Sequence, residues 1–185
     1  MAFALAACAA LSACGGGAPA SYDLEAAIPP HVRAGKIRGV LVVNEPTATA
    51  SYDSDRIVIR TGVDQLAYLA GAQWSDRLPR LVQTRLIETF ENARLLKSVG
   101  RPGLTADNSL ALDLRHFEID VTTNQARVEI AARIVSDQTG RPIAAQVFSG
   151  SAPAPKTGDG VAAAALDQAL REAMQRIVAW TAAKI

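Results

Sequence analysis

The sequence predicts an α+β fold, a single domain in which two amphipathic helices pack on a mostly antiparallel sheet. Two apolar stripes predict the helices: one recurs every four residues from Leu78 to Phe90, and the other runs from Leu166 to Trp180. Short alternating or continuous apolar segments between turn signals predict the strands. Their order along the chain (strands, helix, strands, helix), without an internal repeat, favours this class.

Five segments precede the first helix. An edge strand is expected at Tyr22–Ile28, and a strand buried on both faces at Gly39–Val43, because that run is continuously apolar. Residues 46–51 are small and polar, which indicates a turn or a short helix. Arg56–Arg60 and Leu66–Ala70 flank a Thr-Gly-Val-Asp turn, so they should form a hairpin.

The stretch from Leu66 to Phe90 turns a strand into the first helix through a polar and aromatic corner. Asp76 is a candidate N-cap, and Pro79 then falls in the first turn, where its missing N–H costs nothing. Trp74 lies at the hinge, where its large apolar area should hold strand and helix together.

The next strand contains a change of register. After a helix ending near Asn92 and a short strand at Leu95–Val99, leucines at 110, 112 and 114 share one face. The apolar residues at 117, 119 and 121 fall on the opposite face, which predicts a β-bulge near Arg115 and His116. With that correction, the side chains expected in solvent are His116, Glu118 and Asp120.

The remaining strands and the last helix follow directly. Val128–Ile134 and Ile143–Val147 alternate cleanly, so they should complete a three-stranded antiparallel meander. Ser149–Gly160 is rich in Gly, Pro and Ser and is expected to be a loop. Asp159 could cap the final helix.

Composition excludes several kinds of function. With 185 residues, 19 basic and 18 acidic, and no run of Lys or Arg, the chain is not expected to bind nucleic acid. His31 and His116 lack the partners that a metal site needs, and Asp53 and Asp55 lack the Gly and Glu of a calcium loop. No phosphate-binding loop, dinucleotide motif or nucleophile elbow is present. We therefore expect no catalytic residue, no metal and no cofactor.

The N-terminus resembles that of a bacterial lipoprotein. The first charged residue is Asp23, and Leu11-Ser12-Ala13-Cys14 resembles a lipobox, in which a signal peptidase cleaves before a lipidated Cys. We expect residues 1–13 to be a signal peptide, residues 14–21 the lipidated Cys14 with a flexible tether, and residues 22–185 the folded domain. The segment lacks a basic n-region and is short, which leaves an upstream translation start open. An incidental Cys in an apolar N-terminus is the alternative.

Candidate partner-binding residues lie at the corner and on the first helix. Arg77, Arg80 and Arg85 are expected on its exposed side, where they could meet an acidic partner, and Trp74 is the aromatic residue beside them. Two alternatives stay open: a solvated polar face explains the arginines, and core packing explains Trp74.

These segments together resemble the ABC-type transport auxiliary lipoprotein family. The most specific piece is Tyr68–Pro79, because a Trp at this corner followed by Leu-Pro is not a general requirement of the fold. The other similar segments are Tyr22–Leu24, Val40–Pro46, Asp53–Ile57, the rest of Leu66–Phe90, Leu112–Glu118 and Val178–Trp180.

The resemblance implies a non-enzymatic accessory of a lipid transporter with an inner-membrane permease, an ATPase and an MCE-domain protein that forms a hydrophobic conduit. In that family the lipoprotein stands at the periplasmic face of the outer membrane, held by its N-terminal lipid, and docks the far end of the conduit. Self-association into a homo-oligomer remains open. The alternative function is a structural envelope lipoprotein that binds cell-wall polymer or activates a cell-wall synthase; a periplasmic hydrolase is disfavoured by the missing catalytic constellation.

Overall fold

Strand β7 (Asn108–Asp120) organises the sheet in the computed structural model, which describes residues 18–28, 39–155 and 158–185. On one side, β8 (Gln125–Ser136) pairs with it antiparallel from end to end. β9 (Pro142–Pro153) pairs antiparallel with β8, which confirms the predicted meander. β9 also extends five residues into the segment that the sequence predicted to be a loop, Ser149–Gly160.

Three short strands lie in succession along the other side of β7. They are β2 (Val40–Val43), β3 (Thr47–Ala48) and β4 (Arg56–Gly62), and all three are parallel to β7. β6 (Ser98–Gly100) is parallel to β2 on its outer side. The sheet is therefore mixed but mostly antiparallel, as expected. The turn or short helix predicted at residues 46–51 is partly confirmed: Thr47 and Ala48 bridge to β7 as β3, and a turn follows, in which the Tyr52 N–H donates to the Thr49 carbonyl oxygen (2.9 Å).

A hairpin forms the other end of the sheet. β4 pairs antiparallel with β5 (Gln65–Trp74), which confirms the predicted hairpin and lengthens both strands. β1 (Ala20–Tyr22) pairs in parallel with the last three residues of β5. The strand predicted at Tyr22–Ile28 is therefore wrong for most of its length: residues 23–28 are not in a strand, since their backbone is held by side chains of both helices.

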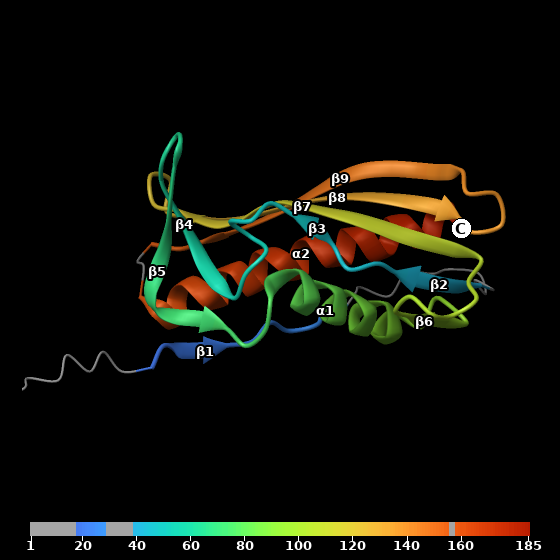
Figure 1. The fold of residues 1–185 in the computed structure, drawn as a ribbon, viewed down its shortest axis with the longest axis horizontal. Coiled ribbons are helices and arrows are strands. Elements are labelled where there is room, and N and C mark those ends of the chain that lie inside the picture. The colour runs from blue at the N-terminus through green and yellow to red at the C-terminus, as the bar shows by residue number, and fades with distance from the viewer. Residues whose placement is uncertain (1–17, 29–38, 156–157) are drawn as a thin grey trace, which may run out of the picture.

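Two helices cover the inner side of the sheet (Figure 1). α2 (Asp159–Lys184) packs along β8 and β9, so closely that a Cβ placed on Gly150 would lie 1.9 Å from the carbonyl oxygen of Ala169. α1 (Leu78–Ala93) lies beside α2 and against β2 and β6. Within the described ranges, neither helix combines the length and apolar character needed to cross a membrane.

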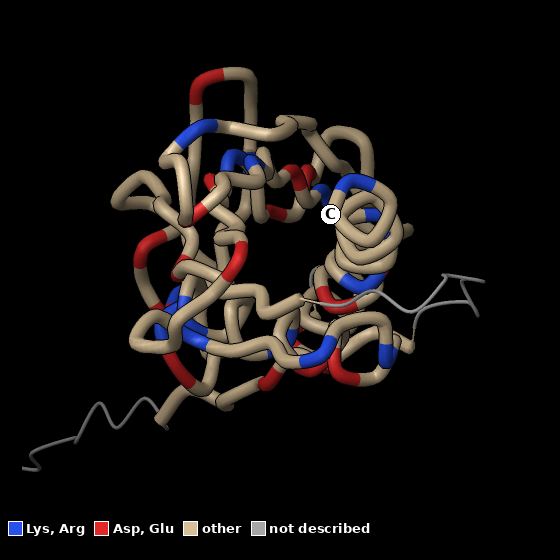
Figure 2. The backbone as a smooth tube through the Cα atoms, turned by 90° about the vertical axis from the view of Figure 1, so that its right-hand side faces the viewer, with Lys and Arg blue, Asp and Glu red and all other residues tan. Residues whose placement is uncertain are grey.

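The core forms where the apolar faces of strands and helices meet. Pairing along β7 and β8 slips between Leu114 and His116, which confirms the predicted bulge. Because of it, Leu110, Leu114 and Phe117 all turn toward the helices and are at most 1% exposed. Seen along the long axis, acidic and basic residues mix around the circumference (Figure 2).

Both predicted helix caps are wrong. Arg77 occupies the N-cap position of α1, and the Asp76 carboxylate accepts the Arg77 N–H (2.7 Å) instead of an N–H inside the helix. Pro79 does fall in the first turn, as expected. At α2 the N-cap is Gly158, and Asp159 already belongs to the helix. Neither helix has a side-chain cap hydrogen bond, so packing and not capping fixes where each begins.

Candidate functional site

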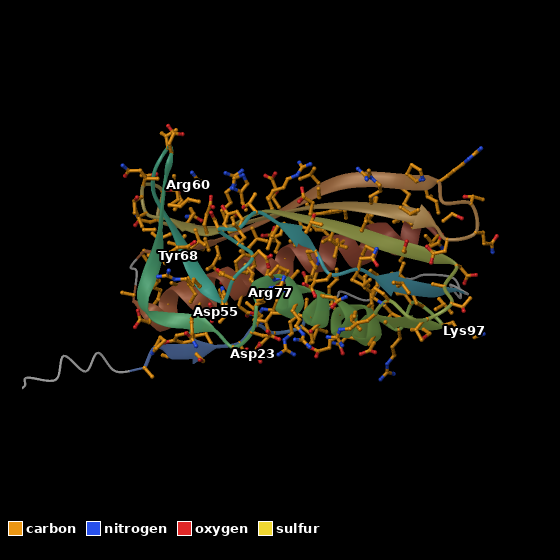
Figure 3. All side chains as sticks on the ribbon, viewed as in Figure 1. Asp23, Asp55, Arg60, Tyr68, Arg77 and Lys97 are labelled. Atoms are coloured by element: carbon orange, nitrogen blue, oxygen red, sulfur yellow. The ribbon has the colours of Figure 1, made fainter. Side chains whose placement is uncertain are left out.

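The three arginines predicted at the first helix lie at the N-cap of α1 (Arg77) and on α1 itself (Arg80 and Arg85), and each is paired with acidic residues of this chain. Arg77 contacts Asp53 (Nη2–Oδ1 2.5 Å) and Glu45 (3.1 Å), on the segments flanking β3. Figure 3 shows Arg77 near the middle of the molecule, at the start of α1. Arg80 is the most exposed of the three and lies 3.5 Å from Asp76. An acidic partner at this surface would have to exchange ion pairs rather than neutralise bare charges.

Arg85 has a different role from the other two. Its guanidinium is mostly buried and donates to Asp23 (2.6 Å) and to Glu88 (2.8 Å). Burial alone would raise the pKa of Asp23, but the hydrogen bonds from Arg85 and from the Leu24 N–H outweigh it and lower that pKa. Arg85 therefore holds the N-terminal segment against α1.

Further contacts fasten the same segment between the two helices. The N–H of Glu25 donates to Asp167 of α2 (2.7 Å), and the N–H of Ala27 donates to Thr89 of α1 (3.0 Å). Burial raises the pKa of Asp167, although Arg171 lies 3.0 Å away. With the β1–β5 pairing, these bonds fix the chain from Ala20 to Ala27 on the body of the domain.

Trp74 lies in the core at the corner before α1, where it is 1% exposed. Its ring meets Phe117 edge-on, with 5.7 Å between the centroids. This geometry supports the packing alternative for Trp74. The Trp74 indole therefore cannot touch a partner without opening the core, which leaves the arginines as the accessible part of the predicted surface.

A buried polar cluster ties the base of the hairpin to β7. Glu118 is fully buried and accepts hydrogen bonds from the Tyr52 hydroxyl and from Arg60 Nε (2.7 Å), and His116 Nδ1 lies 3.2 Å away. The prediction that Glu118 faces solvent is therefore wrong: it does point away from the helices, but Tyr52 and Arg60 cover it. A carboxylate that alternates with apolar strand residues indicates the exposed face, and nothing in the sequence showed that the side chain of residue 52 would cover it.

The electrostatics of this cluster suit a structural role. Burial would raise the pKa of Glu118, but hydrogen bonds from Arg60 and Tyr52 outweigh it and hold that pKa below its ordinary value. Burial and the same carboxylate raise the pKa of Tyr52 well above its ordinary value. A strongly bonded carboxylate is a poor proton acceptor, and a tyrosine of raised pKa is a poor proton donor. No metal-binding group of His, Cys, Asp and Glu occurs among the described residues.

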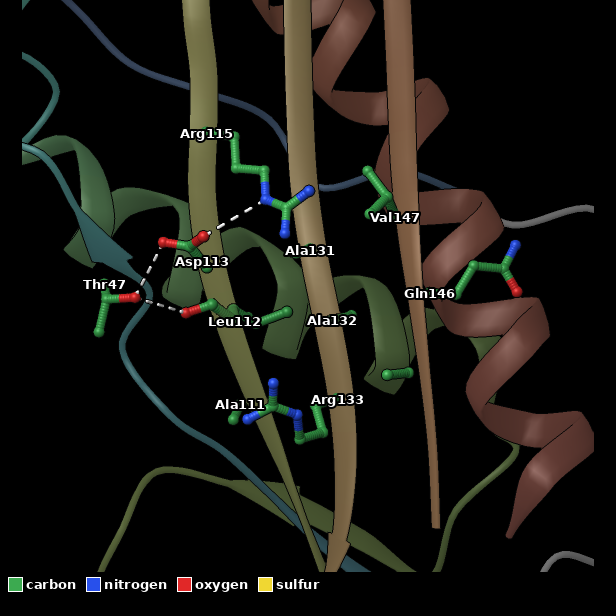
Figure 4. A pocket seen from close by; sticks show the side chains of 11 residues that line it. Thr47, Ala111, Leu112, Asp113, Arg115, Ala131, Ala132, Arg133, Gln146 and Val147 are labelled. Atoms are coloured by element: carbon green, nitrogen blue, oxygen red, sulfur yellow. Dashed lines mark hydrogen bonds and ion pairs between the residues drawn. The ribbon is translucent and has the colours of Figure 1, made fainter. Parts of the chain in front are cut away.

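The outer face of the meander carries a shallow cavity of about 460 Å³ (Figure 4). Its floor contains Ala111, Ala131 and Ala145, and Arg115 and Arg133 project beside it. Arg115 pairs with Asp113 (3.4 Å), which also accepts a hydrogen bond from Thr47. Sequence reasoning did not point to this face, because alternate small residues on a strand do not reveal a concavity until neighbouring strands are placed beside them.

Cys14 and His31 lie outside the described residues. Lipidation of Cys14 and the absence of a metal-binding role for His31 therefore remain predictions. The arginines are on one helix but pair with acids from separate segments of the chain. No single catalytic arrangement emerges among the described residues; the geometry instead offers charged surfaces and a firmly attached N-terminal segment.

Comparisons with known proteins agree with this picture. Residues 22–178 match the model of the family described as ABC-type transport auxiliary lipoprotein component. The uncharacterized protein bll6063 of Bradyrhizobium diazoefficiens is 34% identical over 174 residues, covering 90% of this chain but only 47% of that protein. The chain therefore spans about half the length of this relative.

Solved structures share the fold. Protein XCC0632 from Xanthomonas campestris superposes with a TM-score of 0.83 at 26% identity, over 89% of this chain and 96% of that one. An uncharacterized protein gives a TM-score of 0.71 at 13% identity, over 88% and 97% of the two chains, and this likeness concerns the fold alone. On the family match, the chain belongs to the ABC-type transport auxiliary lipoprotein family.

Proposed function

We propose that this protein is the lipid-anchored accessory subunit of an MCE-type lipid transporter, standing at the periplasmic face of the outer membrane and docking the conduit there. The family match over residues 22–178 carries the proposal. It begins directly after the segment in which Cys14 is the expected lipidation site and residues 15–21 the expected tether. Through the MCE-domain protein, the subunit would act with the permease and the ATPase.

The protein acts by holding its docking surface close to the membrane. Acyl chains on Cys14 hold the N-terminus at the bilayer, since several chains give durable attachment. The tether from Cys14 to Ala20 spans about 20 Å at most when extended. Beyond it, Asp167 and Thr89 hold residues 25 and 27, so the body cannot drift further from the membrane. Confinement of this kind raises the effective concentration of the dock near the conduit.

We assign the docking surface to the start of α1, where Arg77 and Arg80 remain partly exposed above the corner that Trp74 supports. Arg85 contributes indirectly, by holding the N-terminal segment beside this surface. Paired charges of this kind suit a partner surface that carries both signs and exchanges ion pairs on docking.

Site-specific crosslinking in cells tests both the partner and the surface. A photo-crosslinking residue replaces Arg80 on α1 or, as the matched control, Arg133 on the outer face of the sheet; both positions are exposed. We expect an adduct with the MCE-domain protein from position 80 only. An adduct from position 133 only would contradict the assigned surface but keep the partner. Adducts with cell-wall polymer, and none with the MCE-domain protein, would favour the structural envelope role instead.

A further inference from the structure

The hairpin ends in an arm that projects from the body of the domain. Beyond Arg60, the last residue of β4 paired with β7, β4 has only β5 beside it, and β5 is paired with β1 only from Ala72 onward. We define the arm as residues 60–70. Figure 1 shows it standing away from the rest of the sheet.

Three large apolar side chains of the arm are exposed, beside the exposed Asp64 and Gln65 at the turn. Val63 at the turn is 89% exposed, and Leu66 and Tyr68 on β5 are 41% and 39% exposed. Alternation along β5 places Leu66 and Tyr68 on the same side of the strand. Exposed apolar clusters of this kind mark contacts with membranes or proteins.

The position of the N-terminal segment indicates which contact this is. Ala20 pairs with Ala72 at the base of the arm, so β1 begins at the same end of the molecule as the arm (Figure 1). The first turn of α2 lies at the same end of the molecule, because its Gly160 packs against Tyr22 of β1. This turn contributes a further exposed apolar side chain, Val161.

The reach of the two segments is similar. The tether from Cys14 to Ala20 extends to about 20 Å, and β5 from Gln65 to Ala72 rises about 23 Å. A bilayer that holds acyl chains on Cys14 therefore lies within reach of the tip of the arm. A partner bound elsewhere in the periplasm has no such constraint bringing it to the arm.

The chemistry of the arm fits a lipid surface. The guanidinium of Arg56 lies over the ring of Tyr68, 3.9 Å from its centroid. Tyrosine prefers the depth of the lipid headgroups, and arginine binds phosphate with its fork of N–H donors. Val63 and Leu66 then supply the apolar part that enters the acyl boundary, to a depth at which the carboxylate of the neighbouring Asp64 stays among the headgroups.

We propose that the arm is a membrane-contacting element that inserts Val63 and Leu66 into the bilayer to which the chain is anchored, with Tyr68 and Arg56 at the headgroups. This inference rests on the anchoring at Cys14 proposed above. It gives the domain a second attachment and therefore a fixed orientation on the membrane, which a flexible tether alone does not supply.

The test measures insertion with fluorescence quenched by brominated lipid. The chain from Cys14 onward contains no other cysteine, so Cys14 alone couples to vesicles of brominated phosphatidylcholine containing a maleimide-headgroup phosphatidylethanolamine. Val63→Trp places a reporter at the tip of the arm, and Leu104→Trp is the control at an exposed apolar position outside the arm. Emission from Trp74 and Trp180 is subtracted using the chain without an added tryptophan.

We expect the reporter at position 63 to lose about half of its emission relative to vesicles without bromine, since interfacial residues sit about 5–10 Å into the boundary, and the reporter at position 104 to lose almost none. No quenching at position 63, or equal quenching at both positions, would overturn the proposal. A blue shift at position 63 that grows with protein concentration in the absence of vesicles would also overturn it, in favour of a second copy of the chain. Because coupling is chemical, the result does not depend on whether cells acylate Cys14.

Discussion

At the scale of single residues, the most demanding feature is the buried carboxylate of Glu118. Charges are buried only where partners replace their water, and here Arg60, Tyr52 and His116 surround one carboxylate. The cluster joins β4, β7 and the segment around residue 52, which are far apart in the sequence. It therefore fixes the base of the arm relative to the meander.

This cluster predicts a specific dependence of stability on pH. The folded-state pKa of Glu118 is lowered from its ordinary value of 4.5, so the unfolded chain binds more protons below that pH. The stabilisation is complete above pH 4.5 and is lost as the pH falls through the folded-state pKa. We expect Glu118→Gln to lower the free energy of unfolding by about 2–3 kcal/mol at neutral pH, and to make it fall less steeply between about pH 5 and about pH 3.

Urea unfolding followed by circular dichroism measures both effects. Glu91→Gln is the matched control, because Glu91 is exposed on α1; its effect should stay within about 0.5 kcal/mol at every pH. If Glu118→Gln left the slope with pH unchanged, the carboxylate would not be the titrating group that we describe.

At the scale of elements, the close contact between α2 and β9 sets the thickness of the domain. Gly150 faces the backbone of Ala169, and the alanines of α2 let the helix approach. The sequence predicted the helix and its apolar stripe, because helical period is local. It did not predict that β9 runs on to Pro153, because Gly and Ser in that segment serve close packing here rather than a turn.

A single added methyl group tests this contact. In Gly150→Ala the new Cβ would lie 1.9 Å from the Ala169 carbonyl oxygen, so helix or strand must move. We expect a loss of about 3 kcal/mol or more in the free energy of unfolding. Gly39→Ala is the control, since its Cβ would lie at an ordinary 3.5 Å from Asp107 Oδ2. Equal urea midpoints for the two variants would show that α2 is not seated on β9 as described.

At the scale of the whole molecule, the fold class and the family were both predictable, because they depend on patterns spread over the chain. The candidate surface was only partly predictable. Sequence patterns placed Arg77, Arg80 and Arg85 on α1 but could not show that Arg85 turns inward to Asp23, since that contact joins segments far apart in the sequence. The exposure of Val63 and Tyr68 was likewise hidden, because it depends on where β1 and β7 stop pairing.

The N-terminal segment is held between α1 and α2 by hydrogen bonds to Asp167 and Thr89, and the arm lies at the same end of the domain as β1. Acidic and basic residues are intermingled around it, which suits reversible docking more than capture of a strongly charged ligand. We therefore expect docking of the partner to depend on attachment of this chain to the membrane.

The most direct measurement is the membrane distribution of the MCE-domain protein in cells whose only copy of this chain is exported without acylation. The chain from Gly15 onward is placed behind a signal peptide that is cleaved without lipidation, and inner and outer membranes are separated and probed. We predict that the MCE-domain protein disappears from the outer-membrane fraction while the folded domain accumulates free in the periplasm. An unchanged share of the MCE-domain protein at the outer membrane, with this chain unacylated, would contradict the account.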